Sequence, residues 1–149
     1  MSNEEQPQQN VATLQVICGA ILVMPLVYMG GAIAMRFAGA VPETGFADLD
    51  DQTSLILTAA FLVAGISTAV FSSKIKQMIL NAPGIGSVTP ETRFKAVMVA
   101  MALSESGAVM GFLVILLAGN VVYGAVLCGL SFAMTCFHFP SRSWLERGE

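Results

Sequence analysis

One acidic residue, Glu105, lies near the middle of a long apolar stretch, residues 96–118, between two serines. An ionised carboxylate at the centre of a bilayer costs on the order of 3 kcal/mol. No Lys or Arg occurs at that depth in any apolar stretch of the sequence. We therefore expect Glu105 to be protonated at rest, or to hold a cation or a hydrogen-bond donor. The candidate partners of the carboxyl group are Gln15, Ser67, Thr68, Ser104 and Ser106.

The amino-acid composition indicates whether the chain folds in water or in a membrane. Of its 149 residues, 55% are hydrophobic and 11% are charged, and the mean hydropathy is +0.73. A soluble domain carries about twice that share of charged residues. The composition excludes a water-soluble enzyme and a disordered chain, and the net charge of −3 leaves no basic surface for nucleic acid. The expected surroundings are a lipid bilayer.

Four apolar runs are long enough to cross that bilayer as helices. A transmembrane helix needs about 20 predominantly apolar residues, and a membrane strand would show alternating polarity, which these runs lack. The sequence predicts an all-α fold, a polytopic membrane protein built as a four-helix transmembrane bundle. The predicted spans are about 11–35, 53–72, 96–118 and 121–139.

The polar ends and the basic residues set the expected boundaries and orientation. Residues 1–10 are polar and acidic, which is unlike a secretory signal and predicts a disordered leader before a membrane domain of residues 11–140. Most Lys and Arg residues lie in 73–95 and in the tail 141–149. Because basic residues stay on the cytoplasmic side, we expect both termini and that tail in the cytoplasm of a multi-pass protein, in a bacterial inner membrane.

A stripe of small residues runs along one face of the third predicted helix. Such a stripe lets a second backbone approach closely, whether it belongs to a neighbouring helix or to another protomer. At about 100° per residue, Glu105 lies on a largely separate face. The predicted packing residues are Ala96, Ala100, Ser104, Gly107 and Gly111.

Helix boundaries and one irregularity are also visible. Thr89 followed by Pro90 is typical of a helix start, and Asn120 is expected to close a tight hairpin between the last two helices. Pro25 lies inside the first span and is expected to kink it. Gly84 and its neighbours in 81–84 are expected to end the second helix.

The sequence contains no catalytic constellation. The three cysteines match no metal or haem spacing, and the single histidine, His138, is expected to be a polar cap at the membrane interface. No HExxH motif, no Ser/Lys or Asp/Asp pair at depth and no phosphate loop is present. We therefore expect a protein that is not an enzyme, with no metal and no cofactor other than a bound H⁺ or Na⁺.

Residues 102–114, Ala-Leu-Ser-Glu-Ser-Gly-Ala-Val-Met-Gly-Phe-Leu-Val, resemble the ion-binding helix of the rotor proteolipid, subunit c or K, of F- and V-type ATPases. In that family the acid takes up and releases a proton or Na⁺ as a ring turns against a stator. The resemblance implies ion transport at Glu105, and a homo-oligomer or other membrane subunits as partners.

Two functions are compatible with these residues. In the first, Glu105, with Ser104 and Ser106 as candidate ion-binding neighbours, translocates a proton or Na⁺. In the second, the protein is a structural or accessory subunit of a membrane complex. Glu105 is then a neutral group that hydrogen-bonds a neighbouring helix or a partner chain.

Overall fold

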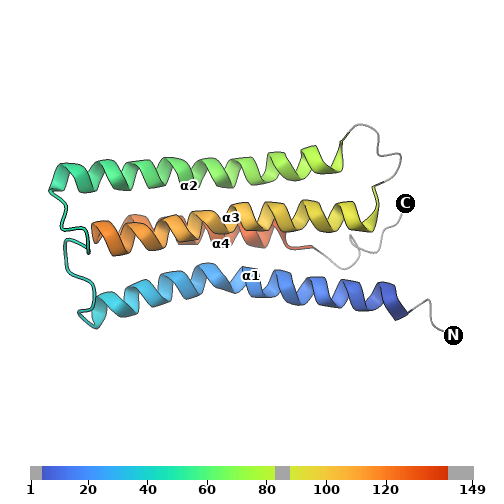
Figure 1. Ribbon diagram of the computed structural model, residues 1–149, viewed down its shortest axis with the longest axis horizontal. Coiled ribbons are helices and arrows are strands. Elements are labelled where there is room, and N and C mark those ends of the chain that lie inside the picture. Colours follow the sequence, from blue (N-terminus) through green and yellow to red (C-terminus); the bar gives the residue numbers. More distant parts are fainter. Residues whose placement is uncertain (1–4, 83–87, 141–149) are drawn as a thin grey trace.

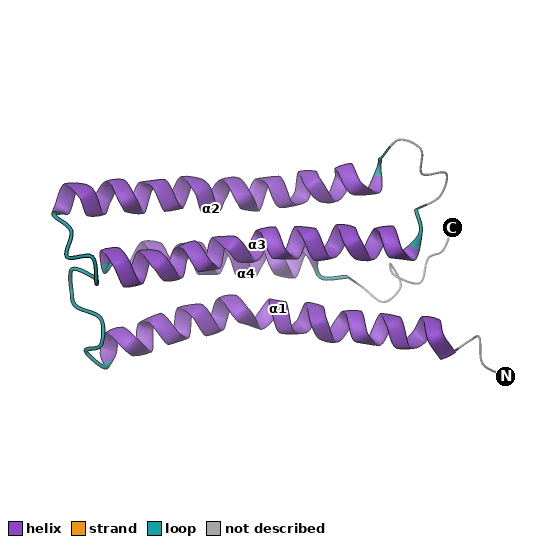
Figure 2. Cartoon of the chain, in the orientation of Figure 1, coloured by secondary structure: helices purple, strands orange, loops and turns teal. Residues whose placement is uncertain are grey.

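The fold is a bundle of four long helices, as the sequence predicts. The computed structural model describes residues 5–82 and 88–140, and the side chains from Thr13 onward. All four helices are long and apolar enough to cross a membrane, so the protein is a multi-pass membrane protein. Figures 1 and 2 show the four helices side by side along the length of the bundle. The helices are α1 (Glu5–Phe37), α2 (Asp51–Leu80), α3 (Pro90–Ala118) and α4 (Val121–His138).

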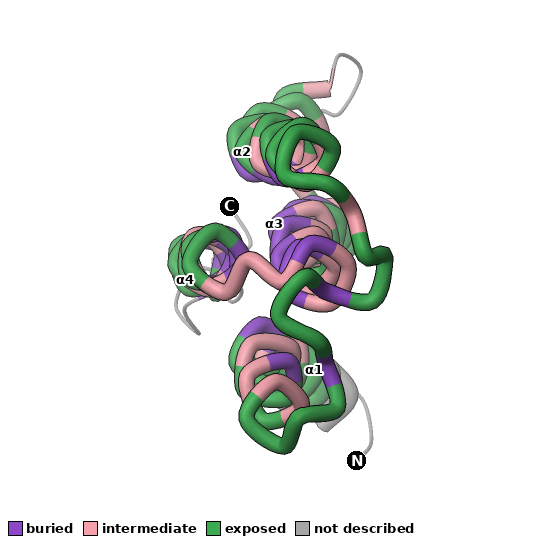
Figure 3. The backbone as a smooth tube through the Cα atoms, turned by 90° about the vertical axis from the view of Figure 1, so that its left-hand side faces the viewer, coloured by how far each residue is buried: buried purple, intermediate pink, exposed green. Residues whose placement is uncertain are grey.

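The third helix forms the centre of the bundle. Figure 3 shows α3 surrounded by α2, α4 and α1 on three sides. Helix α1 packs on α3 and α4 and hardly touches α2. No described helix covers the flank of α3 between α1 and α2. The helix that carries Glu105 is therefore held by every other helix, with one side left toward the surrounding lipid.

The start of α3 follows the predicted capping residue, and α2 begins with a cap of the same kind. The Thr89 hydroxyl accepts a hydrogen bond from the Thr92 amide at 3.2 Å, and Pro90 fills the first helical position of α3. Asp50 caps α2 in the same way, and its hydrogen bonds with the side chain and backbone of Thr53 hold the pKa of its carboxyl below the ordinary value. Local capping thus fixes where both helices begin.

Three helices extend beyond the predicted membrane spans. Helix α1 begins at Glu5, inside the segment expected to be a disordered leader, and α2 and α3 continue past the apolar runs to Leu80 and back to Pro90. The added turns are rich in Glu, Gln and Lys, which are good helix formers, so a helix continues into water once the apolar segment has nucleated it. The predicted tail 141–149 lies outside the described residues.

The connection between α1 and α2 covers the end of α3. Gly119 ends α3 in the left-handed conformation, at φ +66°, and leaves the last carbonyl groups of the helix without helical donors. The connection supplies donors to them. Phe46 N donates to Leu116 O (2.7 Å) and Ala47 N to Leu117 O (3.3 Å), and Ser54 of α2 donates its hydroxyl to Ala118 O (3.4 Å).

Candidate functional site

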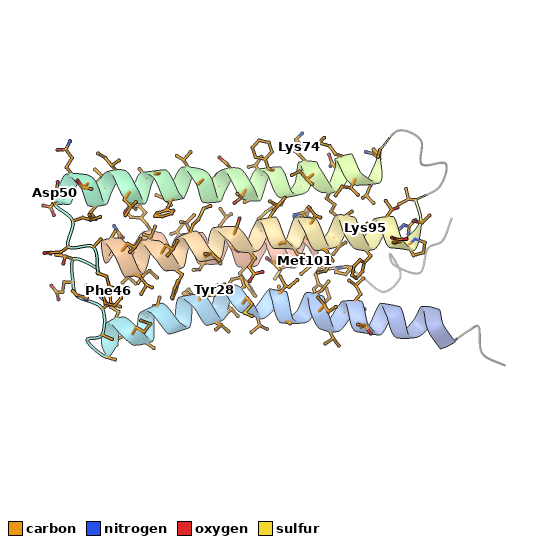
Figure 4. All side chains as sticks on the ribbon, viewed as in Figure 1. Tyr28, Phe46, Asp50, Lys74, Lys95 and Met101 are labelled. Atoms are coloured by element: carbon orange, nitrogen blue, oxygen red, sulfur yellow. The ribbon has the colours of Figure 1, made fainter. Side chains whose placement is uncertain are left out.

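The carboxylate of Glu105 lies at the contact between α3 and α1. Its side chain is half-buried, and the Tyr28 hydroxyl donates a hydrogen bond to Glu105 Oε1 at 3.5 Å. Figure 4 shows Tyr28 and Met101 in the space between α1 and α3. Among the residues that the structure describes, Tyr28 is the single hydrogen-bond partner of this carboxylate. At 3.5 Å the bond is at the long limit for such contacts.

Tyr28 reaches Glu105 because of the direction of its side chain. Its ring contacts the ring of Phe112, which lies about two turns further along α3, with centroids 5.9 Å apart. Long side chains on a helix point back toward its N-terminus. Since α1 and α3 run in the same direction, the Tyr28 hydroxyl returns to the level of Glu105.

One face of α1 covers the face of α3 that carries the acid. Leu14 and Cys18 are buried against Val97 and Met101, one to two turns before Glu105. Further along the same face of α1, Pro25 is buried and Tyr28 is half-buried. The sequence left open whether Glu105 faces lipid, protein or water, and in the structure this face packs on a helix of the same chain.

The other side of Glu105 borders the uncovered flank of α3. Ala102 and Val109, three residues before and four residues after the acid, are exposed. Met101 and Ala108, on the opposite side of the acid, are buried. Glu105 therefore lies at the rim of the α1–α3 contact, with protein on one side and the lipid-facing surface on the other.

No basic side chain described in the structure neutralises Glu105. The Arg36 guanidinium donates to the carbonyls of Pro42 and Val41, in the connection after α1. Lys95 pairs with Glu91 at 2.7 Å near the start of α3. Figure 4 shows Lys74 and Lys95 toward the opposite end of the bundle from Asp50.

The two serines beside Glu105 do not join it. The Ser104 hydroxyl donates to the Ala100 carbonyl at 2.9 Å, and the Ser104 carbonyl accepts from Ser131 of α4, so Ser104 belongs to the α3–α4 contact. The Ser106 hydroxyl donates to the Leu103 carbonyl at 2.7 Å. Of the remaining candidates, Ser67 and Thr68 donate to carbonyl groups of α2.

Tyr28 is the site residue that was not among the partners of Glu105 predicted from the sequence. The available signal was its hydroxyl group, because a Tyr deep in an apolar span needs a polar partner and Glu105 is the strongest acceptor in the neighbouring spans.

The stripe of small residues lies in the interior of the bundle. It packs on α2 and α4 of the same chain. A methyl group built on Gly107 would lie 3.7 Å from the Gly65 carbonyl oxygen and from Ser131, whereas one built on Gly111 would lie 2.5 Å from the Gly124 carbonyl oxygen. All five predicted stripe residues are buried: Ala96, Ala100, Ser104, Gly107 and Gly111.

A second polar pair joins α2 to α4. His138, expected at the interface, is 1% exposed, and its Nε2 lies 2.9 Å from the Ser72 hydroxyl oxygen. Ser72 donates its one proton to the Ala69 carbonyl at 2.6 Å, so His138 Nε2 carries the ring proton and donates to Ser72. His138 Nδ1 is then a buried acceptor that has no hydrogen bond from any residue in the described ranges, 5–82 and 88–140.

The Ser72→Ala substitution is expected to lower the free energy of unfolding by about 1–3 kcal/mol, because it leaves the buried Nε2 proton of His138 without an acceptor. Thermal unfolding of the purified protein in detergent measures the loss. Ser67→Ala is the matched control on α2, because the Ser67 hydroxyl is half-exposed and bonds only the Val63 carbonyl. Equal unfolding temperatures for the two variants would contradict the assignment.

Comparison with known proteins adds no family to this description. No protein-family model, no curated protein and no solved structure matches the chain. Its function is argued from the site itself.

Proposed function

We propose that this multi-pass membrane protein takes part in proton translocation, with Glu105 as the group that binds and releases the proton inside the bilayer. The observation that carries the proposal is the half-buried carboxylate at mid-membrane with one long hydrogen bond, from Tyr28, and no basic partner among the described residues. An acid in that position is stable in the lipid when protonated and costly when ionised. It therefore suits a group that exchanges a proton whenever it meets water.

A proton fits this site better than Na⁺. Hard cations are held by several oxygen ligands at once. Among the described side chains, one hydroxyl, that of Tyr28, lies within hydrogen-bond distance of the Glu105 carboxylate. Ser104 and Ser106 donate to backbone carbonyls of α3 instead.

The resemblance of residues 102–114 to the ion-binding helix of rotor proteolipids supports the same function. It also supports assembly with further copies or with other membrane subunits. The basic end of the bundle, with Lys74 and Lys95, is proposed to face the cytoplasm. In that orientation both chain termini are cytoplasmic.

The Tyr28–Glu105 contact favours a second function, that of a structural or accessory subunit. A hydrogen bond between two membrane helices contributes about 0.6 kcal/mol on average and rarely more than about 2. Glu105 would then be a permanently protonated group that fixes α1 on α3. The two functions differ at the carboxyl group of Glu105. In proton translocation this group releases its proton during each cycle, whereas in the structural role it stays protonated.

Labelling with dicyclohexylcarbodiimide tests the proposal, because this apolar reagent attacks protonated carboxyl groups in membranes. We expect Glu105 to be modified in the folded protein, less at higher pH, and to the same degree with or without Na⁺. Mass spectrometry of the α3 peptide measures the modification, with Glu105→Gln as the unreactive control. A folded protein that stays unlabelled at every pH would overturn the proposal, and protection by Na⁺ would identify Na⁺ as the ion.

A further inference from the structure

Helix α1 is attached to the bundle more loosely than α2 or α4. It packs on α3 and α4 less extensively than α2 packs on α3, and it hardly touches α2. Figure 1 shows α1 bowed, with its middle closest to α3 and its two ends further away. The middle of α1 is the part that covers Glu105.

Pro25 lies in the same part of α1, three residues before Tyr28. A proline inside a helix lacks an amide proton, so the carbonyl group of Ile21 loses its helical donor, and the ring pushes the helix to bend. Pro25 is fully buried, on the side of α1 that faces the bundle, and Tyr28 follows it by three residues on the same side. A bend at Pro25 therefore moves Tyr28 toward or away from Glu105.

Tyr28 makes the polar contact between this helix and the acid. Its hydroxyl donates to Glu105 Oε1, and its ring packs on Phe112. A donated hydrogen bond stabilises the ionised carboxylate more than the protonated one. Without α1 beside it, the carboxyl group would lose this donor and face lipid on both sides, where its protonated form is the stable one.

We propose that α1 is a movable cover over Glu105, hinged at Pro25, and that Tyr28 is the positioning residue that sets how tightly the carboxylate holds its proton. This inference rests on the proposed function, since it describes the control of the same site. It gives the bundle a contacted state in which the proton is released and a withdrawn state in which it is kept.

The test measures the pH at which dicyclohexylcarbodiimide labelling of Glu105 is half-maximal. Tyr28→Phe keeps the ring on Phe112 and removes only the hydroxyl, so a purely structural role for Tyr28 would leave this pH unchanged. We expect the pH of half-maximal labelling to rise by about half to one pH unit. This is a little less than an ideal hydrogen bond to a charged group would give, because the Tyr28–Glu105 bond is long, at 3.5 Å. Tyr123→Phe, at the start of α4, is the matched control and should not move it.

Pro25→Ala tests the hinge independently. It restores the missing helical hydrogen bond, straightens α1 and draws Tyr28 away, so the labelling pH should rise in the same direction. Combined with Tyr28→Phe it should add little, because both changes remove the same contact.

The outcomes separate this inference from the proposed function. If Glu105 is labelled but Tyr28→Phe does not change the pH of half-maximal labelling, the proposal that α1 is a movable cover is refuted. Proton binding at Glu105 remains supported in that case. Additive shifts from Pro25→Ala and Tyr28→Phe would likewise refute the hinge. If Glu105 is never labelled, the proposed function itself fails.

Discussion

Glu105→Gln is expected to abolish proton flux and to leave the fold intact. Glutamine has the shape of glutamate, and its carbonyl oxygen can still accept the hydrogen bond of Tyr28. The free energy of unfolding should therefore change by less than about 1 kcal/mol. The amide cannot bind and release a proton near neutral pH, so the flux should fall at least about tenfold, to the level of vesicles without the protein.

The measurement uses the protein reconstituted in lipid vesicles with a pH-sensitive dye inside and an imposed membrane potential. Glu91→Gln is the matched control, because Glu91 is an exposed acid at the start of the same helix, where it pairs with Lys95. Its loss should leave the flux unchanged, since an exposed pair contributes little. If Glu105→Gln conducts as well as the unaltered protein, the accessory role is favoured over translocation.

The number of helices and the start of α3 at Thr89 followed from the sequence because both depend on local chemistry. Long apolar runs determine the spans, and Thr89 and Asn120 cap the next helix with their own side chains wherever the bundle packs. The mid-membrane acid was equally visible, because an ionisable group in lipid needs an explanation in any fold.

The partner of the acid did not follow from the sequence. Ser104 and Ser106 are adjacent to Glu105 in the chain, but a helix turns neighbours about 100° apart, and their hydroxyls bond to nearby carbonyls. Tyr28 lies far away in the chain and comes close only through the packing of α1 on α3 and the backward tilt of its side chain. Which helix covers the acid is a property of the whole bundle.

His138 shows the same limit. It lies at the end of an apolar run, where a polar side chain usually marks the membrane interface. The structure buries it, because Ser72 of α2 supplies a hydrogen-bond acceptor at the same level of the bundle. The pairing depends on how α2 and α4 are placed, which the individual apolar runs do not encode.

Gly111→Ala is expected to destabilise the bundle strongly, because α3 and α4 are in backbone contact at this residue. The added methyl group would lie 2.5 Å from the Gly124 carbonyl oxygen and 2.9 Å from Cys128 Sγ. Backbone cannot rotate away, so the two helices must separate along their whole contact. Overpacking of this kind costs about 1–3 kcal/mol, and we expect the upper end of that range, measured by thermal unfolding in detergent.

Gly107→Ala, one turn earlier in the same stripe, is the matched control. Its methyl group would meet the Gly65 carbonyl oxygen and Ser131 at 3.7 Å, an ordinary contact, so this variant should unfold at or slightly above the normal temperature. Adding Cys128→Ala to Gly111→Ala should restore little stability, because it removes the sulfur contact and leaves the carbonyl in place. Equal destabilisation by Gly107→Ala and Gly111→Ala would contradict this explanation. The loss of stability would then come from replacing any glycine of the stripe, and not from the close approach of α3 and α4 at Gly111.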